Sequence, residues 1–118
     1  MWIFCFPMGK AQFKMPVQVA VDLDEAQAAA AAEVLKAVAN PLRLRILCLL
    51  SAHEENVKNI AAALNVPSAI VSQQLRILRS AGLVSSRTRG GHAYYEISEP
   101  HLYALLRCIE KCNKDRGP

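Results

Sequence analysis

Three cysteines of this 118-residue chain are spaced in ways that could serve metal or redox chemistry. Cys108 and Cys112 are four residues apart, so on a helix their thiols would lie on one face, close enough to hold one soft metal ion together. Cys48 lies in the stretch "RLRILCLL", where helical geometry places it roughly 145° from the centre of the apolar face. We therefore expect Cys48 to be exposed or covered by another element. Packing as a small apolar residue is the alternative for each of the three.

The composition indicates one domain with reduced thiols. No apolar run approaches the ~18 residues of a membrane-spanning helix, and the start "MWIFCFPMGK" lacks the basic stretch and the cleavage site of a signal peptide. Four cysteines without such a signal favour free thiols in the cytoplasm over a disulfide framework. We expect a cytoplasmic protein with one core and no membrane contact, and we assign no role to Cys5.

A second set of side chains is typical of nucleic-acid binding. Residues 67–98 carry four arginines and one acidic residue, Glu96, in a chain of formal net charge +4. On a helix over 68–80, hydroxyl, amide and guanidinium groups share one face, and such groups bind phosphates and base edges in a major groove. The predicted contacts are Ser68, Ala69, Ser72, Gln73, Arg76 and Arg79. An ordinary solvated helix face is the alternative.

The opposite face of the same helix is apolar and is expected to be buried. It consists of Ile70, Val71, Leu75, Ile77 and Leu78. Gln74 falls in the middle of this face, where an unpaired amide would cost free energy. We therefore expect a hydrogen bond from Gln74 to nearby backbone.

The next segment predicts a β-hairpin with a basic tip. In "LVSSRTRGGHAYYEI", serine, β-branched and aromatic residues surround Gly90-Gly91, a pair that is typical of a two-residue turn between antiparallel strands. Arg87, Arg89 and His92 flank this turn. A wing at this position would contact the adjacent minor groove or the phosphate backbone through these three side chains.

Caps and breaks in the pattern define the elements that would position these residues. A first helix is predicted over 22–40, a second from Pro41 to about residue 52, and a third that ends at Asn65. The helix over 68–81, the hairpin and a last helix with Ser98 as its N-cap follow. The order predicts a mainly α fold with a small β-hairpin: a winged helix-turn-helix with an extra helix at each end. We expect this domain over 22–113, between a flexible N-terminal tail over 1–21 and a C-terminal tail over 114–118.

From about Glu33 to Cys112 the sequence resembles the ArsR/SmtB family of bacterial homodimeric winged-helix repressors. The stretches that carry the resemblance are "LKAVANPLRLRILCLL", "SAIVSQQLRILRSAGLV" and "RTRGGHAYYEIS". The resemblance implies that the first and last helices form a dimer interface. It also implies that the helix over 68–81 reads operator DNA and that an effector releases the DNA.

The same resemblance suggests two kinds of effector site. Cys48 looks like the cysteine of a redox and reactive-sulfur-sensing branch, which pairs it with a second cysteine near the end of the last helix: Cys112 here, with Cys108 next. No cofactor is required for that chemistry. The cysteine motif of arsenic- and cadmium-responsive members is absent from "VKNIAAAL".

The alternative effector is a metal ion, zinc or another thiophilic ion. The last-helix pattern of zinc-responsive members matches Glu99, His101, Cys112 and Asp115, with cysteine in place of one histidine. A thiol set of Cys48, Cys108 and Cys112 would suit arsenite or another soft ion.

The leading hypothesis is therefore a homodimeric transcriptional repressor that thiol chemistry, by a persulfide or an oxidant, releases from its operator. A metal-responsive repressor is the alternative within this class. A winged-helix module for protein interaction is the alternative outside it. We expect no enzyme, because the sequence lacks a phosphate loop and a cysteine with a histidine partner in a catalytic context.

Overall fold

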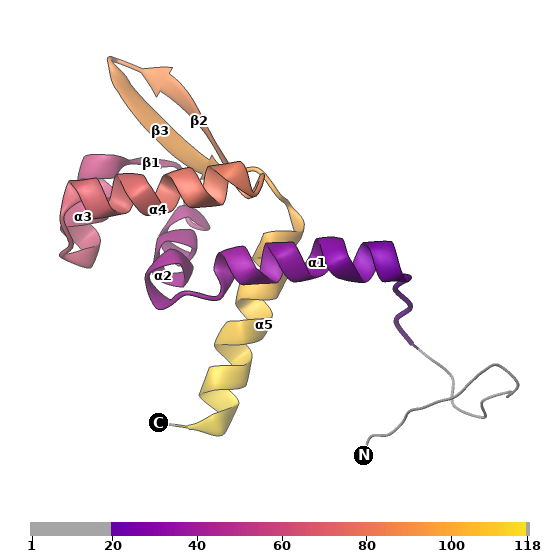
Figure 1. Ribbon diagram of the computed structural model, residues 1–118. Helices are drawn as coiled ribbons and strands as arrows, with labels where there is room; N and C mark the ends of the chain where they lie inside the picture. The colour runs from indigo at the N-terminus through magenta and orange to yellow at the C-terminus, as the bar shows by residue number, and fades with distance from the viewer. Residues whose placement is uncertain (1–19, 118) are drawn as a thin grey trace, which may run out of the picture.

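The computed structural model describes residues 20–117. The predicted N-terminal tail over 1–21, with Cys5, therefore lies almost wholly outside the described residues. In chain order the described elements are α1 (Glu25–Val38), α2 (Pro41–Leu50), β1 (Glu55–Asn56), α3 (Val57–Leu64), α4 (Ser68–Ser80), β2 (Val84–Arg89), β3 (His92–Ile97) and α5 (His101–Arg116) (Figure 1). This is the predicted winged helix-turn-helix with an extra helix at each end.

Local capping explains where the first two helices begin. The Asp24 carboxylate accepts a hydrogen bond from the backbone N–H of Gln27 at 2.8 Å, and the Gln27 side chain accepts one from the Asp24 N–H at 3.0 Å. This reciprocal capping box starts α1. The Asn40 side chain accepts from the N–H of Leu42, and Pro41 occupies the first position of α2, so the chain turns sharply between the two helices.

One residue in the left-handed conformation forms the turn of the helix-turn-helix, and a buried core holds its two helices together. Asn65 has φ 57° and ψ 48°, which ends α3 and lets the chain reverse into α4 within a few residues. The core then collects apolar side chains from α2, α3, α4, the start of β2 and α5. Its fully buried members include Ile46, Leu47, Leu50, Ile60, Val71, Leu75, Leu78, Leu83, Val84 and Leu102.

The wing is a three-stranded antiparallel sheet in the order β1-β3-β2. The hairpin of β2 and β3 turns at Gly90 and Gly91, whose φ values of 58° and 82° favour glycine. The sequence did not predict the short strand β1, which pairs Glu55 with Tyr95 of β3. This third strand joins the wing to the loop that follows α2.

The predicted N-cap of the last helix is wrong. Ser98 donates its hydroxyl to the carbonyl of Gly82 at 3.2 Å, and its backbone N–H donates to Leu83, so Ser98 ties the end of β3 to the segment after α4. α5 begins at His101 and continues to Arg116, which places the first three residues of the predicted C-terminal tail inside the helix. The ion pair of Lys114 with Glu110 at 3.5 Å lies in this last part of α5.

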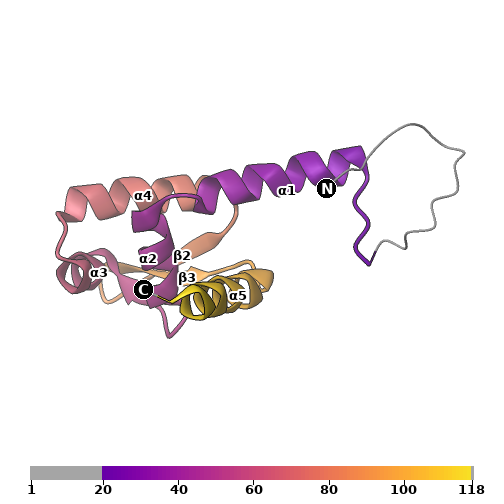
Figure 2. The ribbon, with the colours of Figure 1, turned by 90° about the horizontal axis from the view of Figure 1, so that it is seen from below.

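α1 extends away from the body of the domain, and α5 runs across its direction (Figures 1 and 2). Ala37 and Val38 are the residues of α1 that are buried, whereas Leu23 and Leu35 are 54% and 50% exposed. Among the described residues, no helix has the length and apolar character needed to cross a membrane. The exposed side of α1 therefore has no packing partner among the described residues of its own chain.

Candidate nucleic-acid interface and the Cys48 groove

The face of α4 that the sequence predicted for DNA contact is accessible. Ser68, Ala69, Gln73, Arg76 and Arg79 are exposed, and Ser72 is half-buried. Three residues on the other side of α4, Val71, Leu75 and Leu78, are fully buried. The helix is therefore held by its own core while its polar side stays free.

Two residues predicted on the buried face of α4 are not buried. Ile70 is 39% exposed and Ile77 is 38% exposed, because both lie at the margins of the buried stripe instead of its centre. Ile77 lies in a shallow groove between α1 and α4, together with Val34 of α1. The buried stripe of α4 is thus narrower than the sequence indicated.

The hydrogen-bond partner of Gln74 is a side chain, not the nearby backbone that the sequence suggested. Arg43 of α2 donates its Nη1–H to Oε1 of Gln74 at 2.8 Å. The same guanidinium donates its Nε–H to the carbonyl of Ala37 at 2.6 Å. Arg43 therefore connects the end of α1, the start of α2 and the middle of α4.

Lys58 belongs to the same surface, and sequence reasoning missed it. It is exposed in the first turn of α3 and lines two neighbouring hollows with Ser68 of α4; His92 of β3 lines one of them. The lysine could have been noticed as the basic residue of the helix before the recognition helix. It places a positive charge where α3, α4 and the wing meet.

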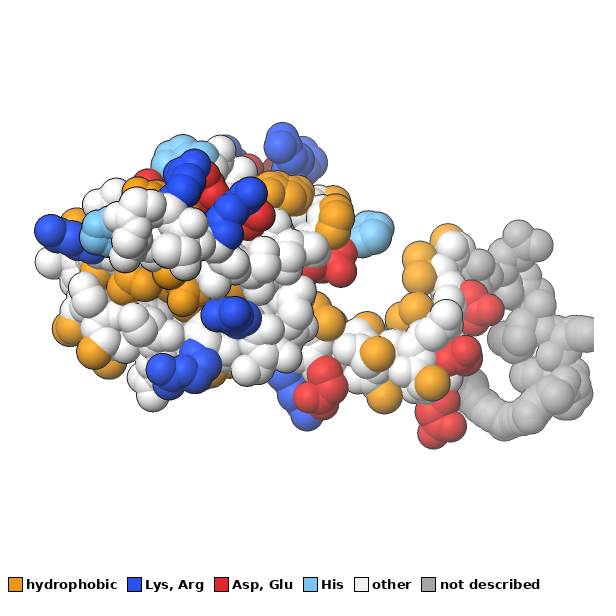
Figure 3. Space-filling model, turned by 90° about the horizontal axis from the view of Figure 1, so that it is seen from above, with side chains coloured by type: hydrophobic (Ala, Val, Ile, Leu, Met, Phe, Trp, Pro, Cys, Tyr) orange, Lys and Arg blue, Asp and Glu red, His pale blue; other side chains and the backbone are white. Residues whose placement is uncertain are grey.

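The two wing arginines are paired with acids of their own chain. Nη2 of Arg87 lies 3.1 Å from both carboxylate oxygens of Glu96, and Nη2 of Arg89 lies 2.8 Å from Oε2 of Glu54. The predicted basic segment omitted Glu54, which directly precedes β1 and whose carboxylate reaches across β3 to the arginines of β2. Two arginines against two glutamates leave this cluster with no formal net charge, and Figure 3 shows acidic side chains directly beside the basic ones on the wing.

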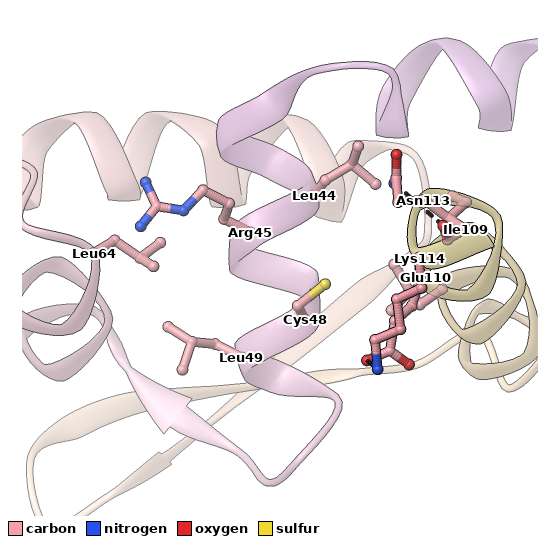
Figure 4. A pocket seen from close by; sticks show the side chains of 10 residues that line it. Leu44, Arg45, Cys48, Leu49, Leu64, Ile109, Glu110, Asn113 and Lys114 are labelled. Atoms are coloured by element: carbon pink, nitrogen blue, oxygen red, sulfur yellow. Dashed lines mark hydrogen bonds and ion pairs between the residues drawn. The ribbon is translucent and has the colours of Figure 1, made fainter. Parts of the chain in front are cut away.

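Cys48 lies in a groove of about 670 Å³ between α2 and α5. Its thiol is exposed and points toward α5, as predicted for a residue off the core face (Figure 4). The groove is mostly apolar, with Glu110, Asn113 and Lys114 of α5 at its polar side. Its other lining residues are Leu44, Arg45, Leu49, Leu64, Leu106 and Ile109.

The other two cysteines do not line this groove. Cys108 and Cys112 are exposed, and on α5 they lie roughly 200° and 240° around the helix from Leu106, which faces the groove. The fold thus places both on the side of α5 away from Cys48 of the same chain.

The residues of the predicted metal sets are not brought together within one chain. His101 and Cys112 are eleven residues apart on α5, which is about 16 Å along the axis. Among residues 20–117, no group of three or more histidine, cysteine, aspartate or glutamate side chains is placed to hold a metal ion. These residues do not fit a metal ion inside a single subunit.

Glu99 and His101 instead bind each other. Oε2 of Glu99 lies 2.7 Å from Nδ1 of His101 and accepts the backbone N–H of His101 at 3.0 Å. The backbone N–H and then the imidazole stabilise the charged carboxylate, so the pKa of Glu99 lies below its usual value. This pair caps the start of α5.

A helix-turn-helix whose second helix presents an arginine-bearing polar face, beside a three-stranded wing, defines a winged helix-turn-helix protein of the DNA-binding class. Residues 40–86 match the family model of the arsR family of bacterial regulatory proteins. Over 87 residues the chain is 42% identical to a transcriptional repressor SmtB homolog from Synechocystis sp., a match that covers 74% of this chain and 64% of that protein. The chain belongs to the ArsR/SmtB family of helix-turn-helix transcriptional regulators, which is a family of regulators and not of enzymes.

Solved structures agree with this assignment. HlyU from Vibrio cholerae superposes with a TM-score of 0.71 at 32% identity, covering 75% of this chain and 97% of that one. A homodimeric winged helix-turn-helix DNA-binding domain from Mycobacterium bovis has a TM-score of 0.71 at 33% identity, with 83% and 93% coverage. HlyU is named a transcriptional activator, and the Synechocystis protein is named a transcriptional repressor homolog.

Proposed function

We propose that this protein is a homodimeric repressor in the cytoplasm that binds double-stranded operator DNA through α4 and leaves it when a cysteine thiol reacts. One observation carries the DNA-binding part: α4 is held by Val71, Leu75 and Leu78, which are 0% exposed, while Gln73 and Arg76 remain exposed. A helix anchored in this way can present its polar side to a major groove without a change in the core.

A second copy of the chain suits the exposed side of α1. Residues 21–30 are all exposed; Leu35 adds apolar surface to α1, and Leu23 adds apolar surface just before the helix begins. A two-fold dimer through α1 and α5 would cover these residues and would present two copies of α4 to one face of the DNA. The homodimeric state of the Mycobacterium bovis domain supports this assembly.

The DNA-binding part is tested with a duplex selected by the protein from a random library, against a scrambled duplex. We expect Arg76→Ala to weaken binding to the selected duplex by roughly 1–3 kcal/mol, since a guanidinium on a base edge contributes that much. Arg116→Ala, which removes the same charge at the end of α5, is the matched control. A wild-type protein without preference for the selected duplex would favour the protein-interaction alternative.

For the effector we propose thiol chemistry at Cys48. A low-molecular-weight persulfide would transfer its outer sulfur to the Cys48 thiolate: a new S–S bond forms at Sγ, the S–S bond of the donor breaks, and the donor leaves as a thiolate. The added sulfur lies in the groove between α2 and α5, and release of the DNA requires that the modified side chain change the packing of these two helices. Because Arg43 joins α2 to Gln74 of α4 at 2.8 Å, a shift of α2 reaches the recognition helix. Cys112, the partner that the family resemblance suggested, would require α5 to rotate.

The thiol proposal is tested by treating the reduced protein with glutathione persulfide, mapping adducts by mass, and measuring affinity for the selected duplex. We expect an adduct at Cys48 and loss of DNA binding. Cys48→Ser should keep its DNA affinity after treatment, whereas Cys108→Ser and Cys112→Ser should respond as the wild type does. A Cys48→Ser protein with the full response would contradict the proposal. Release by stoichiometric zinc or arsenite with unaltered covalent mass would favour the metal alternative, with a site shared between subunits.

A further inference from the structure

One face of the wing carries two basic and two acidic side chains around a tyrosine. The pairing of Glu55 with Tyr95 places Glu54 level with Glu96 on β3, and alternation along the strands puts Arg87, Arg89 and Tyr94 on the same face. Glu54 is only 24% exposed. Its Oε1 is buried and lacks a hydrogen-bond partner among the described residues. This carboxylate thus depends on the arginines for its charge compensation.

The two arginines use their donors differently. Nη2 of Arg87 donates to both carboxylate oxygens of Glu96, and Nε of Arg87 lies 3.8 Å from Oε1 of Glu54. Arg89 makes one ion pair, through Nη2 to Glu54, and its guanidinium carbon lies 4.5 Å above the centre of the Tyr94 ring. Its Nε and Nη1 groups have no partner among the described residues. Among the described residues, Nη1 of both arginines lacks a partner, and Arg89 also keeps its Nε–H free of any acid.

The position of Arg89 adds a second difference. It is the residue directly before the Gly90-Gly91 turn, whereas Arg87 lies two residues further from the turn. The two side chains are similarly exposed, 59% for Arg89 and 63% for Arg87. A carboxylate on one edge and an aromatic ring on one face hold a guanidinium in one orientation. A side chain ordered in this way loses little conformational entropy when it binds a ligand.

We propose that Arg89 is the wing residue that contacts DNA, that Glu54 and Tyr94 are its positioning residues, and that Arg87 ties β2 to β3 within the wing through Glu96. The proposal rests on the DNA-binding function proposed above. It divides roles between two arginines that the sequence could not distinguish. It also assigns a supporting role in DNA binding to an acidic residue, Glu54, where charge alone would predict only repulsion of phosphate.

The test measures affinity for the selected duplex at several salt concentrations. We expect Arg89→Ala to lower affinity on the order of tenfold at low salt and to reduce the slope of log K against log salt by about 0.9, which is the loss of one phosphate contact. Arg87→Ala should keep the wild-type slope and instead lower the thermal unfolding midpoint. Loss of slope in Arg87→Ala, with a wild-type slope in Arg89→Ala, would overturn the assignment.

Glu54 is tested with a double-mutant cycle, because removal of an acid near DNA also removes repulsion. If Glu54 positions Arg89, the Glu54→Ala variant should show the same reduced slope of log K against log salt as Arg89→Ala. The double variant should then show no further reduction of that slope. Glu54→Gln, which keeps an acceptor for Arg89, should restore part of the slope. A rise in affinity with an unchanged or steeper slope in Glu54→Ala would show competition with DNA and overturn the positioning role.

The Arg76→Ala variant separates failure of this inference from failure of the proposed function. If the wild type shows no salt-dependent binding to duplex DNA, both fail. If the wild type binds and Arg76→Ala weakens binding, while Arg89→Ala keeps wild-type affinity and slope, only the inference about the wing fails. Circular dichroism of each variant establishes that α and β content is retained.

Discussion

At the scale of single residues, position in the fold separates side chains of the same type. Cys48 points into a groove beside α5, whereas Cys108 and Cys112 lie on the other side of that helix. Arg89 lies over the Tyr94 ring beside the turn of the wing, whereas Arg87 is held by both carboxylate oxygens of Glu96. Residues of the same type therefore differ in what they can react with or bind, because their neighbours in the fold differ.

Glu55 gives a prediction for stability against pH. Its carboxylate accepts from the side-chain amide of Asn59 at 2.7 Å and from the N–H of Asn56 at 3.1 Å, which hold the pKa of Glu55 below its usual value. A lowered pKa in the folded state stabilises the protein above the unfolded pKa of about 4.3, and this contribution is lost as pH falls through the folded value. The wild type should therefore lose stability relative to Glu55→Gln between about pH 5 and pH 3.

Chemical denaturation of both proteins across this range measures the difference. A difference between wild type and Glu55→Gln that stays constant from about pH 6 to pH 3 would contradict the role of these hydrogen bonds.

At the scale of elements, α2 is the part of the fold that touches both candidate sites. Its first turn carries Arg43, which binds the carbonyl of Ala37 and the side chain of Gln74 on α4. Its other end carries Cys48 in the groove against α5. A rigid helix of ten residues between these two points gives a direct physical path from the groove to the recognition helix.

Gln74→Leu tests this connection. It should lower the free energy of unfolding by about 1 kcal/mol, because Nη1 of the half-buried Arg43 loses its acceptor. Gln73→Leu, one position away on the exposed side of α4, should change stability by less than about 0.5 kcal/mol. Urea denaturation compares the two variants. Equal stability of both would show that the hydrogen bond of Arg43 to Gln74 contributes little to the packing of α4.

The elements themselves could be predicted because their signals are local. Asn40-Pro41, Asn65 and the Gly90-Gly91 turn each mark a boundary through neighbours in the chain. The strand β1, the tie of Ser98 to Gly82 and the partner of Gln74 were missed because each depends on residues far apart in sequence. The contact between Glu54 and Arg89 was missed for the same reason. A count of charges along the chain does not reveal that Glu54 lies on the wing, because the hairpin begins 30 residues later in the sequence.

At the scale of the whole molecule, the described chain has a compact winged domain and a helix that leaves it. α1 contributes two buried residues to the core, and its outer turns are exposed. α4 and α1 lie nearly end to end in Figure 2, and α5 runs across the direction of α1 in Figure 1. A two-fold axis near α1 and α5 would therefore place the two copies of α4 at the outer ends of the assembly.

The spacing of the operator half-sites follows from such a dimer. Two recognition helices on a two-fold dimer enter successive major grooves on one side of the duplex, so we expect half-sites with centres about one helical turn apart, roughly 34–36 Å. The dimer should sediment at twice the chain mass of 13.0 kDa. Insertion of about 5 base pairs between the half-sites rotates one of them by about half a turn and should reduce affinity to that of a single half-site. Electrophoretic mobility shifts on the parent, inserted and single half-site duplexes measure this. Affinity that is unchanged by the insertion, or a stoichiometry of one chain per duplex, would show that each chain binds alone.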